Sequence, residues 1–163
     1  MNPLRSALRM ILGKRPPAMQ VGAVCRDPRT AEILLITSRG TGRWIIPKGW
    51  PMAGRTLAQA AAQEAWEEAG VEGRMHEAEI GRYEYEKEQD SGFSVSVEVR
   101  VFLLEVDRLR HAFPESGERR RRWFAPVDAA RLVAEPGLKR ILHDLGRAAP
   151  PPARSGTEDG NRA

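Results

Sequence analysis

Three carboxylates stand at i, i+3 and i+4 in the segment from Gly49 to Val71: Glu64, Glu67 and Glu68. On a helix this spacing places all three on one face, where they repel one another unless a cation lies among them. Hard oxygen ligands that leave room for waters and substrate phosphates are what Mg²⁺ or Mn²⁺ prefers. The pattern indicates a divalent-metal site for phosphate chemistry, with a solvated helix surface as the alternative.

The segment that carries these glutamates has its own helix start and stop signals. Thr56, followed three residues later by Gln59, is a capping box, and Gly70 suits the left-handed residue that ends a helix. We therefore expect a helix over residues 57–69. Four alanines recur along it at spacings of four, three and four: Ala58, Ala62, Ala65 and Ala69. This narrow stripe lets the helix pack closely on a sheet, while another face carries the carboxylates.

A short strand and a loop precede this helix. Residues 44–49 read as a strand that breaks at Pro47, and the loop that follows bears glycine. Such a loop can place backbone carbonyls beside the three glutamates. It thereby strengthens the interpretation of the glutamates as a site.

The segment from Gly49 to Val71 resembles the Nudix box, whose pattern is G-x5-E-x7-R-E-U-x-E-E-x-G-U, with U an aliphatic residue. Six positions match in register, and Ala65 is a small substitute at the first aliphatic position; the six are Gly49, Glu64, Glu67, Glu68, Gly70 and Val71. The resemblance extends over about residues 21–145, and residues 123–130 are similar to the family's last strand running into its final helices. It implies an α/β fold, a Nudix-type α/β/α sandwich with a mixed β-sheet.

The same resemblance implies roles for the residues of the box. Glu67 and Glu68 would bind the metal with a carbonyl of Gly49, while Glu64 would be a further ligand or the group that activates water. Members of the family differ in which glutamate is the base, so Glu64 and Glu67 are both catalytic candidates. The expected cofactor is Mg²⁺ or Mn²⁺, and the bond cleaved is a phosphoanhydride.

Two positions of the box depart from the family pattern: its first Glu is Arg55 here, and its Arg is Gln63. In the family these two residues form an ion pair that braces the loop against the helix. Their joint replacement removes a brace rather than a metal ligand. Arg55 and Gln63 can still hydrogen-bond to one another, and we expect activity to survive with a looser loop.

Residues 38–49 are similar to the diphosphoinositol polyphosphate phosphohydrolase branch of the family. The arginine run before Trp123 also resembles that branch, although the Glu usual just before this Trp is Arg122 here. Glu115 and Glu118 are candidates for a second acidic group from a mobile loop. Charge-assisted contacts with phosphate are expected from the following cations: Arg39, Arg43, Lys48 and Arg122.

Several functions stay open within this resemblance. The resemblance implies a small-molecule substrate that is a diphosphoinositol polyphosphate or a dinucleoside polyphosphate, and Trp50 or Tyr85 could stack on a nucleobase. A non-catalytic module that binds a nucleotide or inositol polyphosphate is the contrasting class. A pyrophosphohydrolase of RNA 5′ ends is a third, and nucleic acid is expected only as such a 5′-phosphorylated end. Both a monomer and a homodimer are compatible with the sequence.

The whole chain fits one domain. It has 163 residues and a net charge of +4, and 22 of its 26 basic residues are arginine. We expect a basic N-terminal extension at residues 1–17, the Nudix domain at 18–147 and a disordered tail at 148–163. No run approaches the ~20 apolar residues of a membrane span and no signal peptide is evident, so a cytoplasmic enzyme is expected. Cys25, the single cysteine, reads as a small apolar strand residue.

The remaining elements follow from alternation and turn residues. Residues 21–26 and 32–37 are expected to form a hairpin, and residues 43–46 a short strand. Residues 78–87 and 94–106 are expected to be two longer strands, the second with one buried face before it becomes apolar throughout. A C-terminal helix is indicated by apolar residues at i, i+3, i+4 and i+7: Leu138, Ile141, Leu142 and Leu145.

Overall fold

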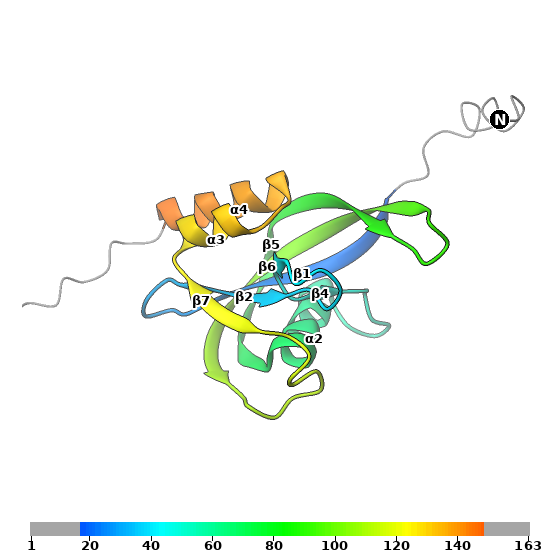
Figure 1. The fold of residues 1–163 in the computed structure, drawn as a ribbon. Helices are drawn as coiled ribbons and strands as arrows, with labels where there is room; N and C mark the ends of the chain where they lie inside the picture. The colour runs from blue at the N-terminus through cyan, green and yellow to red at the C-terminus, as the bar shows by residue number, and fades with distance from the viewer. Residues whose placement is uncertain (1–16, 149–163) are drawn as a thin grey trace, which may run out of the picture.

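A computed structural model of the chain describes residues 17–148 (Figure 1). The elements in this range are, in order, β1 (Ala18–Arg26), β2 (Ile33–Thr37), β3 (Trp44–Ile45), β4 (Lys48–Gly49), α2 (Leu57–Ala69), β5 (Val71–Glu88), β6 (Ser94–Leu109), β7 (Arg121–Phe124), α3 (Pro126–Leu132) and α4 (Pro136–Ala148). The expected N-terminal extension before residue 17 and the expected tail after residue 148 lie outside the described residues.

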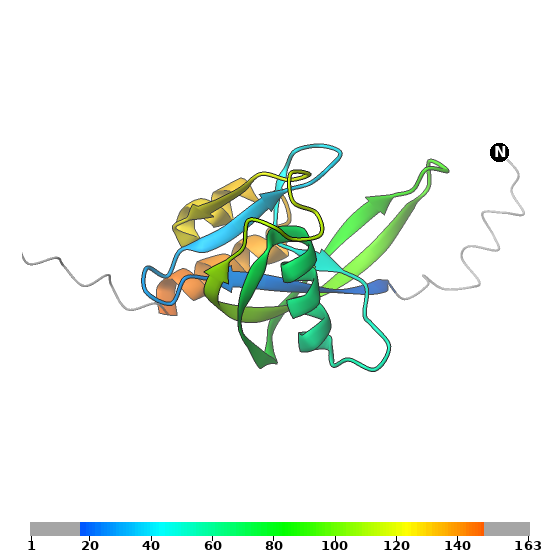
Figure 2. The same cartoon turned by 90° about the horizontal axis from the view of Figure 1, so that it is seen from below.

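The strands form one mixed sheet in the order β3-β2-β1-β6-β5. Its central pair, β1 and β6, is parallel, and the other pairs are antiparallel, with β4 joined to β1 and β7 joined to β2. Helix α2 covers one face of the sheet, and α3 and α4 lie together on the other (Figures 1 and 2). The predicted α/β/α sandwich with a mixed β-sheet is confirmed.

Side-chain alternation divides the core between the two faces of the sheet. On β6, Val97, Val99 and Val101 pack toward α3 and α4, whereas Phe102 and Leu104 pack toward α2. Strands β1 and β2 alternate in the same way, because successive strand residues point to opposite faces. The predicted change of β6 from a strand with one buried face to a fully buried one is therefore confirmed.

Helix α2 begins and ends where its local signals predict. The Thr56 hydroxyl accepts a hydrogen bond from the Gln59 backbone N–H, and the Gln59 side chain accepts one from the Thr56 backbone N–H. Gly70 ends the helix with φ 65° and ψ 30°, a left-handed conformation that favours glycine. The buried positions of the alanine stripe are Ala58, Ala65 and Ala69, joined by Ala60 and Ala61. These small side chains let α2 lie close to the sheet.

Strand boundaries differ from the sequence-based ones mainly in β5 and β6. The hairpin of β1 and β2 is confirmed, with Cys25 opposite Leu34. Strand β5, however, begins at Val71 and not near residue 78, and β6 continues to Leu109. Three register shifts interrupt the pairing of these strands before Gly81. Such bulges break the period-2 alternation from which a strand is predicted.

Helices α3 and α4 pack against the face of the sheet opposite α2. Leu138, Ile141 and Leu142 of α4 are buried, and Leu145 packs against the same cluster, which confirms the predicted apolar stripe. Close approach is needed here: a Cβ atom on Gly81 would lie 2.8 Å from Ile141 Cγ1. In the part of the chain that the structure describes, no helix combines the length and apolar character needed to cross a membrane.

Candidate active site in an acidic cleft

The predicted site residues of α2 line a cleft of about 640 Å³, which we call the acidic cleft. Its floor carries Glu64, Glu67 and Glu68 from α2, and the loop that leads from β6 to β7 adds Glu115 and Glu118. Lysine and arginine side chains line the same cleft: Arg39, Lys48, Lys87 and Arg119. Segments far apart in the chain thus bring carboxylates and cations together.

Gly49 leaves the space that the Glu64 carboxylate occupies. A Cβ atom on Gly49 would lie 2.1 Å from Glu64 Oε1 and 2.2 Å from its Cδ, so no larger residue fits without moving this carboxyl group. Burial, followed by the neighbouring carboxylates of Glu68, Glu67 and Glu115, raises the pKa of Glu64 to about 7. Gly49 of β4 and Glu64 of α2 are therefore packed directly against each other.

Glu68 is the most buried of the three α2 carboxylates, with 9% of the residue exposed. Its Oε2 accepts a hydrogen bond from the Lys48 backbone N–H at 3.2 Å, and its Oε1 accepts one from Arg119 at 3.0 Å. Burial raises the pKa of Glu68, and the Arg119 guanidinium and the Lys48 N–H oppose this shift. The strand before the helix thus offers Glu68 a backbone N–H donor.

Glu67 is held by the residue that replaces the arginine of the family pattern. The Gln63 side-chain amide donates to Glu67 Oε1 at 2.8 Å, one helical turn away. The expectation that Gln63 could instead bond to Arg55 is not realised among the side-chain hydrogen bonds of residues 17–148, where Arg55 is exposed. The Gln63 amide N–H thus donates to the carboxylate one helical turn away.

The loop that carries Glu115 is fastened to the end of α2. The Glu115 backbone N–H donates to the Glu67 backbone carbonyl at 3.0 Å, and the Arg121 guanidinium donates to the Ala69 carbonyl at 2.6 Å. The same guanidinium lies over the Phe113 ring, 5.0 Å from its centre. Phe113 also lies against Gly70, where a Cβ atom would be 2.4 Å from the ring. These contacts fix Glu115 beside the α2 carboxylates.

One wall of the acidic cleft combines aromatic rings with lysines. Lys48 Nζ lies 4.9 Å from the centre of the Tyr85 ring, and Lys87 Nζ lies 5.1 Å from the centre of the Trp50 ring. The Tyr85 hydroxyl donates to Gln20 at 2.7 Å. Burial lowers the pKa of Lys48, and the nearby Glu68 and Glu135 carboxylates oppose that shift. Trp50 and Tyr85 hold these lysines as cation–π partners.

Two of the predicted substrate-binding residues do not line the acidic cleft. Arg43 is exposed and donates to Thr41 at 3.2 Å, and Arg122 lies over the Phe124 ring, 5.4 Å from its centre. Alternation along β7 sends Arg120 and Arg122 to the aromatic rings of the α3–α4 face, whereas Arg121 points toward α2. Arg119, from the same arginine run, is the one that lines the cleft. The arginine run was evident in the sequence, but the face of the sheet to which each of its side chains points was not.

The donors of the acidic cleft suit a hard divalent cation. They are carboxylate oxygens that share one helix face and are held together although burial and mutual repulsion raise the pKa values of Glu64 and Glu68. Within residues 17–148, however, no three His, Cys, Asp or Glu side chains already form a group that could hold a metal ion. Gln63 engages Glu67, and Arg119 with the Lys48 N–H engages Glu68.

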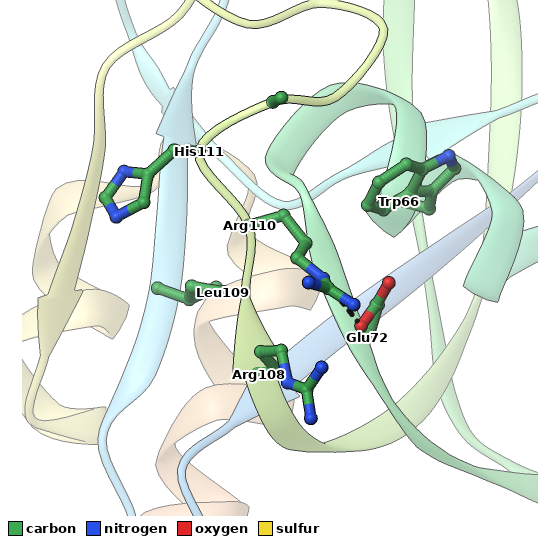
Figure 3. A pocket seen from close by; sticks show the side chains of 7 residues that line it. Trp66, Glu72, Arg108, Leu109, Arg110 and His111 are labelled. Carbon is green, nitrogen blue, oxygen red and sulfur yellow. Dashed lines mark hydrogen bonds and ion pairs between the residues drawn. The ribbon is translucent and has the colours of Figure 1, made fainter.

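A second cavity, of about 460 Å³, is lined by Trp66 near the C-terminal end of α2 and by residues 108–112, and it shares no lining residue with the acidic cleft. Figure 3 shows Trp66, Arg108 and the ion pair of Arg110 with Glu72, whose N–O distance is 3.0 Å. With a single carboxylate in its lining, this cavity does not offer the oxygen ligands of the acidic cleft.

Cys25 is fully buried in β1, as predicted for a small apolar strand residue. Burial raises the pKa of its thiol to about 12, so the thiolate that a nucleophile requires is not populated near neutral pH.

Comparison with known proteins places this architecture in a family. The model of the NUDIX domain matches residues 16–145, and the chain therefore belongs to the Nudix family. The chain is 31% identical over 124 residues to mouse "Diphosphoinositol polyphosphate phosphohydrolase 3-alpha", an alignment that covers 72% of this chain and 71% of the mouse protein. It is 30% identical over 121 residues to "Nudix hydrolase 13, mitochondrial" of Arabidopsis thaliana, covering 71% of this chain and 60% of that protein.

The plant relatives are longer than the matched region. The alignments span 50% to 64% of five of these proteins. Solved structures confirm the fold: an E. coli dihydroneopterin triphosphate pyrophosphohydrolase has a TM-score of 0.61 at 19% identity, covering 83% of this chain and 98% of that one. A C. elegans Ap4A hydrolase has a TM-score of 0.57 at 21% identity, covering 81% and 98% of the two chains.

Proposed function

We propose that this chain is a divalent-metal-dependent pyrophosphohydrolase that cleaves a phosphoanhydride bond of a polyphosphorylated small molecule by attack of water. One observation carries the proposal: carboxylates and cations share the acidic cleft. The carboxylates are Glu64, Glu67, Glu68 and Glu115, and the cations are Arg39, Lys48, Lys87 and Arg119. Carboxylates suit a divalent cation, and the surrounding basic groups suit the phosphates of a substrate.

The metal would be held by Glu64, Glu67 and Glu68, with a carbonyl of Gly49 as a further ligand. When bound, Mg²⁺ or Mn²⁺ polarises phosphoryl oxygens and lowers the pKa of water. Gly49 keeps the Glu64 carboxylate close to the strand, because any side chain there would displace it. Gln63 orients the Glu67 carboxylate along the helix.

Glu64 is our candidate for the group that takes a proton from the attacking water, with Glu67 as the alternative. A general base works best when its pKa lies near the working pH. Without a bound cation, burial and then the neighbouring carboxylates raise the pKa of Glu64 to about 7. A bound cation would move this pKa downward, since opposite charges favour the ionised carboxylate.

Lys48 and Lys87 are the cations most available for substrate phosphates. Arg39 pairs with Glu115 and Glu118 at N–O distances of 3.5 Å and 3.4 Å, and Arg119 pairs with Glu68 and Glu115. Neither lysine makes an ion pair within residues 17–148, and each lies over an aromatic ring. We therefore expect phosphates to bind first along the wall that carries Lys48 and Lys87.

The substrate we propose is a diphosphoinositol polyphosphate or a dinucleoside polyphosphate. The names of the mouse relative and of the C. elegans structure support these two classes. Trp50, with 47% of the residue exposed at the edge of the cleft, is a candidate to stack on a nucleobase.

The test is release of phosphate and pyrophosphate from a substrate panel. It comprises diphosphoinositol polyphosphates, diadenosine polyphosphates, nucleoside triphosphates, ADP-ribose and 5′-triphosphate RNA, with Mg²⁺, with Mn²⁺ and with EDTA. We expect turnover that EDTA and Glu67→Gln abolish and that Glu72→Gln leaves intact. Glu72 is a matched control because it is a glutamate outside the acidic cleft. Tight binding without turnover of any member would instead support the non-catalytic binding module.

A further inference from the structure

Arg119 is a buried cation within the acidic cleft. Its side chain is 8% exposed, and one terminal nitrogen, Nη2, lies 3.0 Å from Glu68 Oε1 and 3.4 Å from Glu115 Oε1. The other terminal nitrogen, Nη1, donates to the Thr37 carbonyl at 3.1 Å, and Nε is buried without a hydrogen-bond partner in the described part of the chain. A single guanidinium thus joins a carboxylate of the helix to a carboxylate of the loop.

Hydrogen bonds to the end of β2 orient this guanidinium toward the carboxylates. The Arg120 backbone N–H donates to the Thr37 hydroxyl at 2.9 Å, and the Thr37 backbone N–H donates to the Arg120 carbonyl at 2.9 Å. Thr37 itself is buried at the end of β2. The backbone next to Arg119 is therefore fixed to the sheet, and its side chain reaches Glu68 from a rigid element.

A buried carboxylate needs a compensating positive charge or several hydrogen bonds. For Glu68 the donors are the Arg119 guanidinium and the Lys48 backbone N–H. Arg39 also contacts Glu115, at an N–O distance of 3.5 Å, but its side chain is 62% exposed and makes no ion pair with Glu68. Arg119 alone among the described ion pairs brings a full positive charge to Glu68.

We propose that Arg119 is the internal counter-ion of the metal site. Without a divalent cation it bridges Glu68 and Glu115, so a cation that binds Glu68 has to displace it. The released guanidinium then faces the interior of the cleft, where phosphates of the substrate would lie. This inference rests on the proposed function, because it assumes that Glu68 binds the metal.

The contacts predict two opposite effects of removing Arg119. The metal-free chain should lose stability, because Glu68 keeps its burial but loses its charged partner. The affinity for the metal should rise, because the competitor for Glu68 is gone. A residue with a purely structural role would lower stability without making metal binding tighter.

The experiment is a Mn²⁺ titration of the full chain without substrate, followed by electron paramagnetic resonance of free Mn²⁺. Arg119→Gln should bind Mn²⁺ about tenfold more tightly than wild type, within the usual range of coupling between two ligands of one site. Arg39→Gln is the matched control: it removes one positive charge beside Glu115 but no contact with Glu68, and it should change the affinity by at most about twofold. Equal effects of the two variants, or weaker binding by Arg119→Gln, would overturn the proposal.

Arg119→Lys covers the case in which Arg119→Gln fails to fold. A lysine keeps the charge but lacks the planar fork that reaches two carboxylates and a carbonyl at once. Its affinity for Mn²⁺ should lie between those of wild type and Arg119→Gln, and an affinity equal to that of wild type would contradict the competition. If wild type itself binds no Mn²⁺ and shows no metal-dependent turnover, the proposed function fails and not merely this inference.

Discussion

The two faces of the sheet are covered by helices that contribute different kinds of side chain. Toward α3 and α4 the core consists largely of branched aliphatic residues, among them Ile33, Leu35, Leu138 and Leu142. Toward α2 the helix contributes five buried alanines, and the same helix carries the charged Glu68 with only 9% of the residue exposed. The sheet buries large apolar side chains on both faces, but α4 adds leucine and isoleucine to one face, whereas α2 adds alanines to the other and sets carboxylates at its edge.

This difference separates stability from chemistry. Large aliphatic side chains contribute more to stability on burial than alanines do, since the gain follows the apolar area removed from water. The α2 face also carries carboxylates that repel one another, which lowers the stability of the metal-free chain. We therefore expect substitutions on the α3–α4 face to change mainly stability, and substitutions beside the acidic cleft to change mainly turnover.

The largest effect should come from Leu142→Ala on the α3–α4 face. Leu142 is fully buried, so its truncation leaves a cavity and should lower the free energy of unfolding by about 3 kcal/mol. Turnover per folded molecule should stay unchanged, because Leu142 lies on the face opposite α2. Urea denaturation and initial rates measure the two quantities. A loss of turnover in the folded variant would show that the two faces are not independent.

Gly49→Ala should produce the reverse pattern. The three atoms nearest to the new Cβ all belong to the end of the Glu64 side chain, which can move, so thermal stability should change little. Turnover should fall about a hundredfold, since displacement of a reacting group by about 1 Å has an effect of this size. Gly73→Ala is the matched control: its Cβ would lie 2.0 Å from the Glu105 backbone carbonyl oxygen. That variant should lose stability, and an equal stability loss in Gly49→Ala would contradict the account.

The metal-free chain should lose stability as the pH rises, because of Glu64. Its pKa is about 7 in the fold against an ordinary value of 4.5. The folded state binds the proton more tightly, so this contribution is full below about pH 4.5 and is lost as the pH rises through 7. The melting temperature of Glu64→Gln should therefore rise relative to that of wild type as the pH increases from about 5 to about 8, a range that brackets the raised pKa. Calorimetry in EDTA measures both melting temperatures.

Added Mg²⁺ serves as the control for this prediction. A cation among the carboxylates favours the ionised form, so Mg²⁺ should raise the melting temperature of wild type more than that of Glu64→Gln at pH 8, a pH about one unit above the raised pKa. A pH dependence that is the same in wild type and Glu64→Gln would exclude Glu64 as its source.

The smallest effect is expected from the double substitution Arg55→Glu with Gln63→Arg, which restores the family pattern. A new ion pair between the loop and α2 should raise the melting temperature by about 2 °C, as a partly exposed pair contributes less than about 1 kcal/mol. Turnover should change by less than about threefold, given that the Gln63 contact with Glu67 is exchanged for another donor. A rise in turnover of several orders of magnitude would show that the native site is impaired.

Local signals were sufficient to predict α2 and the place of its glutamates. The capping box of Thr56 and Gln59 and the terminating Gly70 lie within the helix's own segment, so the bounds of α2 follow from neighbouring residues. The start of β5 did not follow, since register shifts between Glu72 and Gly81 break the alternation. The bounds of an element can therefore be predicted where the residues that start and end it lie within its own segment.

The partners of the α2 carboxylates could not be derived in this way. Arg119 and Glu68 are 51 positions apart, and their contact depends on how β7 pairs with β2. The arginine run was evident in the sequence, but a shift of one residue in a strand reverses which side chains point to each face. Arg122 was therefore expected in the cleft, whereas Arg119 lines it.

The most direct test of the central claim is Mn²⁺ binding by wild type and by the double variant Glu67→Gln, Glu68→Gln, with folding of both checked by circular dichroism. The account predicts that wild type binds Mn²⁺ and that the variant, which lacks two charged ligands on α2, binds it at least about a hundredfold more weakly. Equal binding by the two proteins would contradict the account, because the metal would then be held elsewhere.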